Sequence, residues 1–153
     1  MQTFDYTFTV DAPLTAVSTF HHNTSVLKTL TPPPIVAQIH HFDPMGEGAV
    51  ADFTLWFGPL PVRWQAVHSN VSINGFTDTQ QSGPLKSWQH THRFTAVSPH
   101  TTQIHEHIKY EHDTGWRGVL SRLLFAKPGL YMLFTARKLI TRYHLKKEHR
   151  DGK

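Results

Sequence analysis

The sequence predicts an α+β protein in which a seven-stranded antiparallel sheet wraps around one long C-terminal helix. The first ten residues alternate between apolar and polar side chains, which is the period of a half-buried strand. From residue 35 to residue 113, β-branched and aromatic segments follow one another without a helix-length segment between them, which disfavours parallel crossover units. After residue 115 the apolar period becomes helical. The length of 153 residues predicts one domain, residues 1–153.

The N-terminal elements are a strand and two short helices. Phe4, Tyr6, Phe8 and Val10 share one strand face and predict a strand over residues 3–10. The segment 11–13 provides a helix N-cap followed by proline in the first turn, and a second short helix runs to residue 30. The prolines at 32–34 end that second helix, because they lack a backbone donor and favour extended geometry.

Six further strands are expected in the middle of the chain. Glycine and proline turns separate them at residues 43–46, 58–59, 82–84 and 98–99. The strands are predicted over residues 35–42, 49–57, 62–69, 75–80, 85–95 and 101–111.

The C-terminal third is predicted to be helical. One short helix carries Val119, Leu120, Leu123 and Leu124, and a long helix begins at Pro128. The apolar face of the long helix is predicted to hold Met132, Leu133, Ala136, Leu139, Ile140 and Tyr143. The cations Arg137, Lys138, Arg142, Lys146 and Lys147 occupy most of the remainder, which favours a solvated face, with weak contact to a membrane surface as the alternative.

Composition excludes several classes of function. The net charge is +4, but Lys and Arg collect after residue 117 instead of forming a phosphate-tracking surface, so no nucleic-acid partner is expected. The absence of cysteine excludes disulfides, thiolate metal sites and cysteine nucleophiles. No signal peptide, membrane span or glycine-rich phosphate loop is recognisable, so we expect a cytoplasmic protein without a cofactor.

The alternation also assigns side chains to the two faces of the sheet. A tight hairpin at residues 82–84 places Phe76 opposite His90 and Asp78 opposite Trp88. The next hairpin brings His90 and His92 near Glu106. The resulting even-numbered face holds Phe76, Asp78, Gln80, Trp88, His90, His92, Phe94, Ile104, Glu106, Ile108 and Tyr110.

This face mixes aromatic and ionisable side chains. A buried polar group without a partner costs about 1–3 kcal/mol, so these residues either satisfy one another or line a cavity that admits a ligand. The candidate catalytic residues are His90, His92, Glu106 and Asp78. A His-x-His strand with a nearby carboxylate is compatible with a metal site, but this spacing is common among 13 histidines and no metal is predicted.

The other histidines receive no chemical role. His105 and His107 fall on the opposite, odd-numbered face and are expected to be exposed to solvent. The adjacent pairs at 21–22 and 40–41 cannot share a strand face.

The sequence resembles the START-like superfamily, also called SRPBCC, which includes polyketide cyclase/dehydrase-like proteins. The resemblance covers nearly the whole chain, and its most specific stretch is Gly75-Phe76-x-Asp78-x-Gln80-x-x-Gly83-Pro84-x-x-x-Trp88-x-His90-x-His92-x-Phe94. It implies a helix-grip fold with a hydrophobic cavity between sheet and C-terminal helix. It also implies pocket-lining roles for Phe76, Asp78, Trp88, His90, His92 and Tyr110. Many members of the superfamily carry Asp where this chain has Glu106.

Two functions are compatible with these observations. The leading hypothesis is binding of a hydrophobic small molecule, whether lipid, aromatic or polyketide-like, without catalysis. The predicted ligand-binding residues are Trp56, Trp64, Phe76, Asp78, Trp88, His90, His92, Glu106, Tyr110 and Phe134. The alternative is a cyclase/aromatase-like enzyme in which His90 or His92 is the general base, oriented by Glu106 or Asp78.

Overall fold

The computed structural model describes residues 1–152 and contains the α+β architecture that the sequence predicts. Seven strands form one antiparallel sheet in the order β1-β7-β6-β5-β4-β3-β2. The strands are β1 (Gln2–Val10), β2 (Ile35–Phe42), β3 (Val50–Phe57), β4 (Leu60–Ser72), β5 (Gly75–Ser82), β6 (Ser87–Ser98) and β7 (Thr101–Glu111). The helices are α1 (Leu14–His22), α2 (Val26–Leu30), α3 (Gly115–Leu124) and α4 (Lys127–Asp151).

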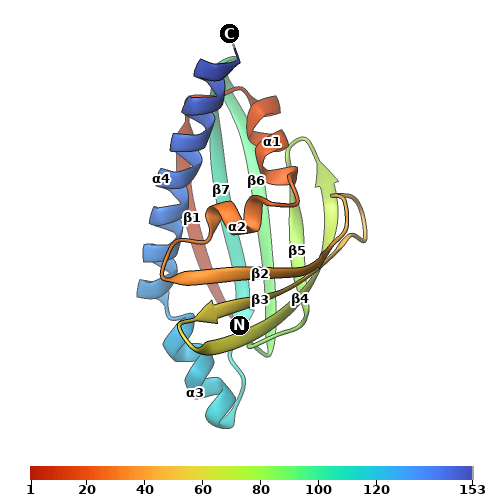
Figure 1. Ribbon diagram of the computed structural model, residues 1–153, viewed down its shortest axis with the longest axis vertical. Helices are drawn as coiled ribbons and strands as arrows, with labels where there is room; N and C mark the ends of the chain where they lie inside the picture. Colours follow the sequence, from red (N-terminus) through yellow and green to blue (C-terminus); the bar gives the residue numbers. More distant parts are fainter. Residues whose placement is uncertain (153) are drawn as a thin grey trace.

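The sheet is strongly curved, and its concave side faces the helices. Figure 1 shows β2, β3 and β4 running across the direction of β1, β6 and β7, with α4 along the side of the sheet near β1. Leu130 and Phe134 of α4 pack in one core cluster with Phe4, Trp88 and Tyr110 of the sheet. The long helix is thus held by the sheet, as expected for a helix-grip arrangement.

The register of the β5–β6 hairpin differs from the prediction by two residues. Phe76 lies opposite His92 and Asp78 lies opposite His90, so the predicted pairs Phe76–His90 and Asp78–Trp88 are wrong. The connection is longer than a tight turn, because the ladder between the two strands ends at the pair Thr79–Gln89 and Leu85 of the connection is buried. A shift of two residues preserves the side-chain face, so the predicted even-numbered face is retained.

The β6–β7 hairpin brings together the residues that the sequence predicted. Trp88 lies opposite Tyr110, and His92 lies opposite Glu106. Gly75 supports this region from β5: its φ is 133°, and a Cβ atom there would lie 1.9 Å from the carbonyl oxygen of His92. Only glycine allows the two backbones to approach this closely.

The buried face of α4 matches the predicted apolar face only in part: Leu133 and Ile140 pack against the core, but three of the six predicted residues do not. Met132, Leu139 and Tyr143 are 75%, 59% and 64% exposed, so their predicted place in the core is wrong. The buried residues of α4 are Leu130, Phe134, Thr141 and Leu145. The buried stripe includes a threonine and passes beside Arg137, so hydrophobicity alone could not identify it.

Helix α3 shows a similar partial disagreement, since Leu124 packs against the core but two of the four predicted apolar residues are exposed. It buries Gly118 and Ser121, whereas Val119 and Leu123 are exposed. Gly118 packs so closely that an added Cβ would lie 1.9 Å from the carbonyl oxygen of Asp113. Gly118 therefore allows the segment just before α3 to lie closely against the helix. Within residues 1–152, no helix is both long enough and apolar enough to cross a bilayer.

Candidate functional site

A cavity of about 130 Å³ lies on the concave side of the sheet, between the strands, the two N-terminal helices and α4. Most of its lining is apolar. The apolar lining comprises Val26, Leu27, Leu30, Phe42, Met45, Ala51, Phe53, Leu55, Trp64, Ala66, Phe76, Trp88, Phe125, Leu133 and Phe134. The ionisable residues His21, His68, Asp78, His90, His92 and Arg137 complete it.

Seven of the ten predicted ligand-binding residues lie at this cavity. They are Trp64, Phe76, Asp78, Trp88, His90, His92 and Phe134. Glu106 and Tyr110 are buried next to these residues in the sheet but do not line the cavity.

Trp56 lies on the other side of the sheet, so the prediction that it lines the pocket is wrong. In β3 the inward-facing residues have odd numbers, as Ala51 and Phe53 show. The Trp56 indole N–H instead donates to Gln38 Oε1 at 3.0 Å on the exposed face. The sequence of β3 is apolar on both faces near its end, which concealed the phase of the alternation.

The predicted catalytic candidates form one connected polar network. His90 Nε2 lies 2.8 Å from Glu106 Oε2, and His92 Nε2 lies 3.1 Å from Asp78 Oδ2. His92 Nδ1 also lies 2.8 Å from Glu106 Oε2, although without the alignment of a hydrogen bond. The two imidazole rings are tilted against each other with their centroids 3.9 Å apart. The network is therefore internally bonded, and three of its members, Asp78, His90 and His92, also line the cavity.

Cross-strand pairing explains how this network arises. Asp78 of β5 lies directly opposite His68 of β4 and opposite His90 of β6. His92 lies opposite Glu106 of β7 on the same face. Four adjacent strands thus contribute one or two ionisable side chains each to one region of the concave surface.

The network separates the protonation states of its two histidines. Burial lowers the pKa of His92, but the Glu106 carboxylate and the hydrogen bond to Asp78 outweigh this effect and raise the pKa to about 9. Burial and the neighbouring His92 cation lower the pKa of His90. Burial opposes ionisation of Glu106, yet His92 and His90 hold its pKa well below its usual range. At neutral pH, His92 is a cation, His90 is neutral and Glu106 is an anion.

Arg137 is a functional candidate that sequence reasoning placed on the solvated side of α4. Its side chain instead lines the cavity, and its guanidinium carbon lies 5.2 Å from the centroid of the Phe134 ring. Burial lowers the pKa of Arg137, while Glu106 and Asp78 raise it. The Nε of Arg137 is buried and has no hydrogen-bond partner among residues 1–152. Its spacing of three residues from Phe134 was the sequence signal that could have identified it.

His21 and His68 also line the cavity and were missed. His21 Nδ1 donates to the carbonyl oxygen of Val17 at 2.8 Å, and burial lowers its pKa to about 4. His68 Nδ1 lies 3.0 Å from the carbonyl oxygen of Ala49. Because Nδ1 of His21 donates to the backbone and its lowered pKa keeps the ring neutral, its Nε2 atom is an acceptor. His21 and His22 are adjacent on a helix, so periodicity did not indicate that His21 faces the cavity.

Asp78, His90 and His92 have the spacing of a metal site, since each offers one ligand atom and these atoms lie within 4.8 Å of one another. However, His92 is buried between two carboxylates, Asp78 and Glu106, which favour its protonated, cationic form. The raised pKa of His92 means that a metal ion would have to displace a firmly held proton. The geometry is better explained by the hydrogen-bonded network.

Comparisons with known proteins connect this geometry to a fold. No protein-family model matches the sequence, and no curated protein matches it. Among solved structures, the Zhui aromatase/cyclase from a Streptomyces species is similar, with a TM-score of 0.76, 12% identity, and coverage of 96% of this chain and 94% of that chain. A START superfamily protein from Mycobacterium smegmatis gives a TM-score of 0.71 at 9% identity, covering 95% of this chain and 97% of that chain.

A protein from Chromobacterium violaceum also matches, with a TM-score of 0.76, 11% identity, and coverage of 95% of this chain and 98% of that chain. At these identities the likeness concerns the fold. Together with the seven-stranded antiparallel sheet and its long C-terminal helix, it shows that the chain has the helix-grip fold of the START superfamily.

Proposed function

We propose that this protein binds a small hydrophobic molecule that carries an oxygen acceptor, held between the sheet and α4. The observation that supports this proposal best is the cavity itself, which joins an apolar lining to the buried guanidinium of Arg137. Buried donors in proteins are nearly always paired, so an unpaired Nε–H beside a cavity favours a ligand that accepts a hydrogen bond. Apolar burial would supply most of the affinity.

The volume restricts the size of the ligand. An engineered apolar cavity of about 150 Å³ binds benzene, so a cavity of about 130 Å³ accommodates one aromatic ring or a short alkyl segment. A longer lipid or a polycyclic polyketide would require the helices to separate from the sheet.

Charge indicates which acceptor fits best. At neutral pH the carboxylates of Asp78 and Glu106 balance the cations of His92 and Arg137. An anionic ligand would add an uncompensated buried charge, whereas a neutral carbonyl oxygen would not. We therefore expect a carbonyl compound to be preferred over a carboxylate.

The experiment compares two molecules of nearly the same shape, acetophenone and ethylbenzene, which differ by the carbonyl oxygen. Binding is followed through the four tryptophan indole N–H signals in ¹H–¹⁵N NMR spectra. Trp64 and Trp88 line the cavity and should shift, whereas Trp56 and Trp116 lie outside it and serve as internal controls. We expect acetophenone to bind about tenfold more tightly than ethylbenzene.

Arg137→Met should abolish this preference while leaving ethylbenzene binding unchanged. Lys147→Gln, an exposed change on the same helix, is the matched control and should behave like the original protein. Shifts confined to Trp56 or Trp116, or no binding of either compound, would contradict the proposal.

A second candidate function is acid–base catalysis on a bound carbonyl compound. The observation that favours it is the pair of adjacent imidazoles with pKa values displaced in opposite directions, His92 upward and His90 downward. His92 would donate a proton to the substrate oxygen, and neutral His90 would accept one from a neighbouring carbon. The similarity to an aromatase/cyclase is consistent with such chemistry.

Formation of a product distinguishes catalysis from ligand binding alone. A soluble aromatic β-diketone is incubated with the protein, and mass spectrometry is used to detect cyclised or dehydrated products. For an enzyme, His90→Gln and His92→Gln should each reduce turnover by about 10²-fold or more while ligand affinity changes little. Equal turnover in both variants and the original protein would exclude catalysis by this pair.

A further inference from the structure

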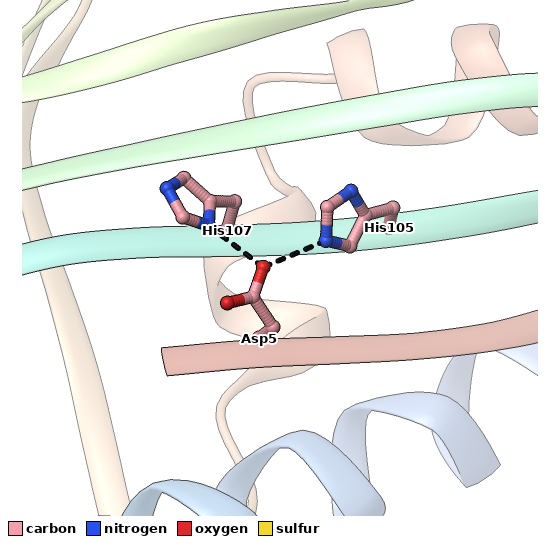
Figure 2. A group of neighbouring side chains, drawn as sticks. All are labelled: Asp5, His105 and His107. Carbon is pink, nitrogen blue, oxygen red and sulfur yellow. Dashed lines mark hydrogen bonds and ion pairs between the residues drawn. The ribbon is translucent and has the colours of Figure 1, made fainter. Parts of the chain in front are cut away.

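A second histidine–carboxylate cluster lies on the opposite face of the sheet from the cavity. It consists of Asp5 on β1 and of His105 and His107 on β7. His105 Nε2 lies 2.8 Å from Asp5 Oδ1, and His107 Nδ1 lies 2.7 Å from the same oxygen. Figure 2 shows both imidazole rings turned toward this one carboxylate atom.

The register between β1 and β7 produces this convergence. Asp5 lies directly opposite His107, and Thr7 lies opposite His105. Residues 105 and 107 project from the same face because strand side chains alternate. The side chains are accessible: both histidines are 29% exposed and Asp5 is 52% exposed.

We propose that Asp5, His105 and His107 bind a divalent transition-metal ion of the zinc type. Each residue offers one ligand atom, and the three atoms lie within 4.8 Å of one another. Two imidazole nitrogens and one carboxylate oxygen form a ligand set that suits zinc and leaves further positions for water.

The geometry requires little adjustment. With metal–ligand bonds of about 2.0–2.1 Å, neighbouring ligand atoms of a tetrahedral site are separated by about 3.3 Å. The nitrogen–oxygen distances of 2.8 Å and 2.7 Å would therefore increase by about 0.5 Å, which a half-exposed aspartate rotamer can provide. The imidazoles can keep their approach toward the same point.

Metal binding would also move two protons. Asp5 accepts hydrogen bonds from His105 Nε2 and His107 Nδ1, and these are the nitrogens that would ligate the ion. Each ring would therefore lose its proton at that nitrogen to water and gain one at the other nitrogen, giving the opposite neutral tautomer. Figure 2 shows that the second nitrogen of each ring points away from Asp5, so it can hold the new proton.

Neighbouring charges set the strength of binding. Arg93 lies opposite His105 on β6, and Lys109 is two residues beyond His107 on the same face of β7. Both cations oppose a bound divalent ion. The site should therefore bind more weakly than a closed site with four protein ligands.

The test is a titration of the untagged protein with zinc chloride, in which isothermal titration calorimetry measures the binding. We expect one zinc ion per chain. His105→Gln, His107→Gln and Asp5→Asn should each weaken binding by more than about tenfold. His100→Gln, which changes an exposed histidine at the β6–β7 turn, is the matched control and should bind as tightly as the original protein.

A second measurement does not depend on comparing variants. Long-range ¹H–¹⁵N NMR spectra should show the tautomers of His105 and His107 exchanging when zinc is added and returning when a chelator removes it. The ion should also raise the melting temperature of the original protein, because it binds the folded chain and links β1 to β7.

Three results would overturn the proposal. The first is a lack of zinc binding by the original protein. The second is equal binding by all three variants and the His100→Gln control. The third is loss of binding in His92→Gln but not in His105→Gln, which would place the ion at the buried Asp78–His90–His92 group instead.

Discussion

At the scale of single residues, the buried network combines ionic groups whose isolated burial would be costly. The Glu106 carboxylate contacts both His90 and His92, and Asp78 accepts a hydrogen bond from His92. A buried charge is tolerated only when paired and hydrogen-bonded. The stability of this region should therefore depend on the proton that His92 carries.

This dependence predicts how stability changes with pH. The pKa of folded His92 is about 9 against 6.5 for the unfolded chain, so its stabilisation is complete below pH 6.5 and is lost as the pH rises through 9. The loss should approach about 3 kcal/mol of unfolding free energy. His21 acts oppositely: its folded pKa of about 4 makes stability rise between pH 4 and pH 6.5.

Urea unfolding from pH 4 to pH 9.5 measures both the rise in stability at acidic pH and its fall at alkaline pH. His92→Gln should remove the alkaline fall, whereas His100→Gln, at an exposed position, should retain it. An alkaline fall of the same size in His92→Gln would show that another group is responsible.

At the scale of elements, the sequence predicted strands more reliably than helix faces. In β6 and β7 strict alternation places Trp88, His90, His92 and Glu106 on one face, and a two-residue error in hairpin register did not disturb that assignment. In α4 the buried residues include Thr141, and the apolar residues Met132, Leu139 and Tyr143 are exposed, so apolar periodicity identified the buried face only in part. Arg137 carries a charge, so periodicity assigned it to solvent, although the cavity accommodates it.

The corrected face of α4 predicts a contrast between two residues of similar hydrophobicity. Phe134 is 1% exposed and packs against Phe4 and His90, whereas Met132 is 75% exposed. Phe134→Ala should lower the unfolding free energy by about 3–5 kcal/mol through lost burial and a new cavity. Met132→Ala should change it by less than about 0.5 kcal/mol.

Chemical denaturation of both variants provides the measurement. A loss for Met132→Ala as large as that for Phe134→Ala would contradict this assignment and place Met132 in the core, as periodicity predicted.

At the scale of the whole molecule, the same strands of the curved sheet build two chemically different surfaces, one on each face. Even-numbered residues of β6 and β7 build the cavity network, while odd-numbered residues of β7 meet Asp5 on the outer face. Sequence patterning predicted this division between faces. It could not predict the cavity, because its volume depends on how α2 and α4 close over small residues such as Ala51 and Ala66.

Filling the cavity should therefore separate ligand binding from folding. Ala66 is buried, lies opposite Ala51 in β3 and lines the cavity, so the side chain of Ala66→Leu would enter unoccupied space. We expect the unfolding free energy to be unchanged or to rise by up to about 1 kcal/mol, because cavity filling adds apolar contacts. Acetophenone affinity, measured by the shifts of Trp64 and Trp88, should fall more than about tenfold because the site is closed. Ala96→Leu, at an exposed position of β6, is the control and should preserve binding.

The two readouts also test the premises separately. A well-packed core would lose about 1–3 kcal/mol on such an enlargement, so a loss of that size would show that the space beside Ala66 is not available to a ligand. Undiminished acetophenone binding in a stable Ala66→Leu variant would place the ligand elsewhere in the molecule. Stability retained together with binding lost is the combination that the cavity between sheet and helix requires.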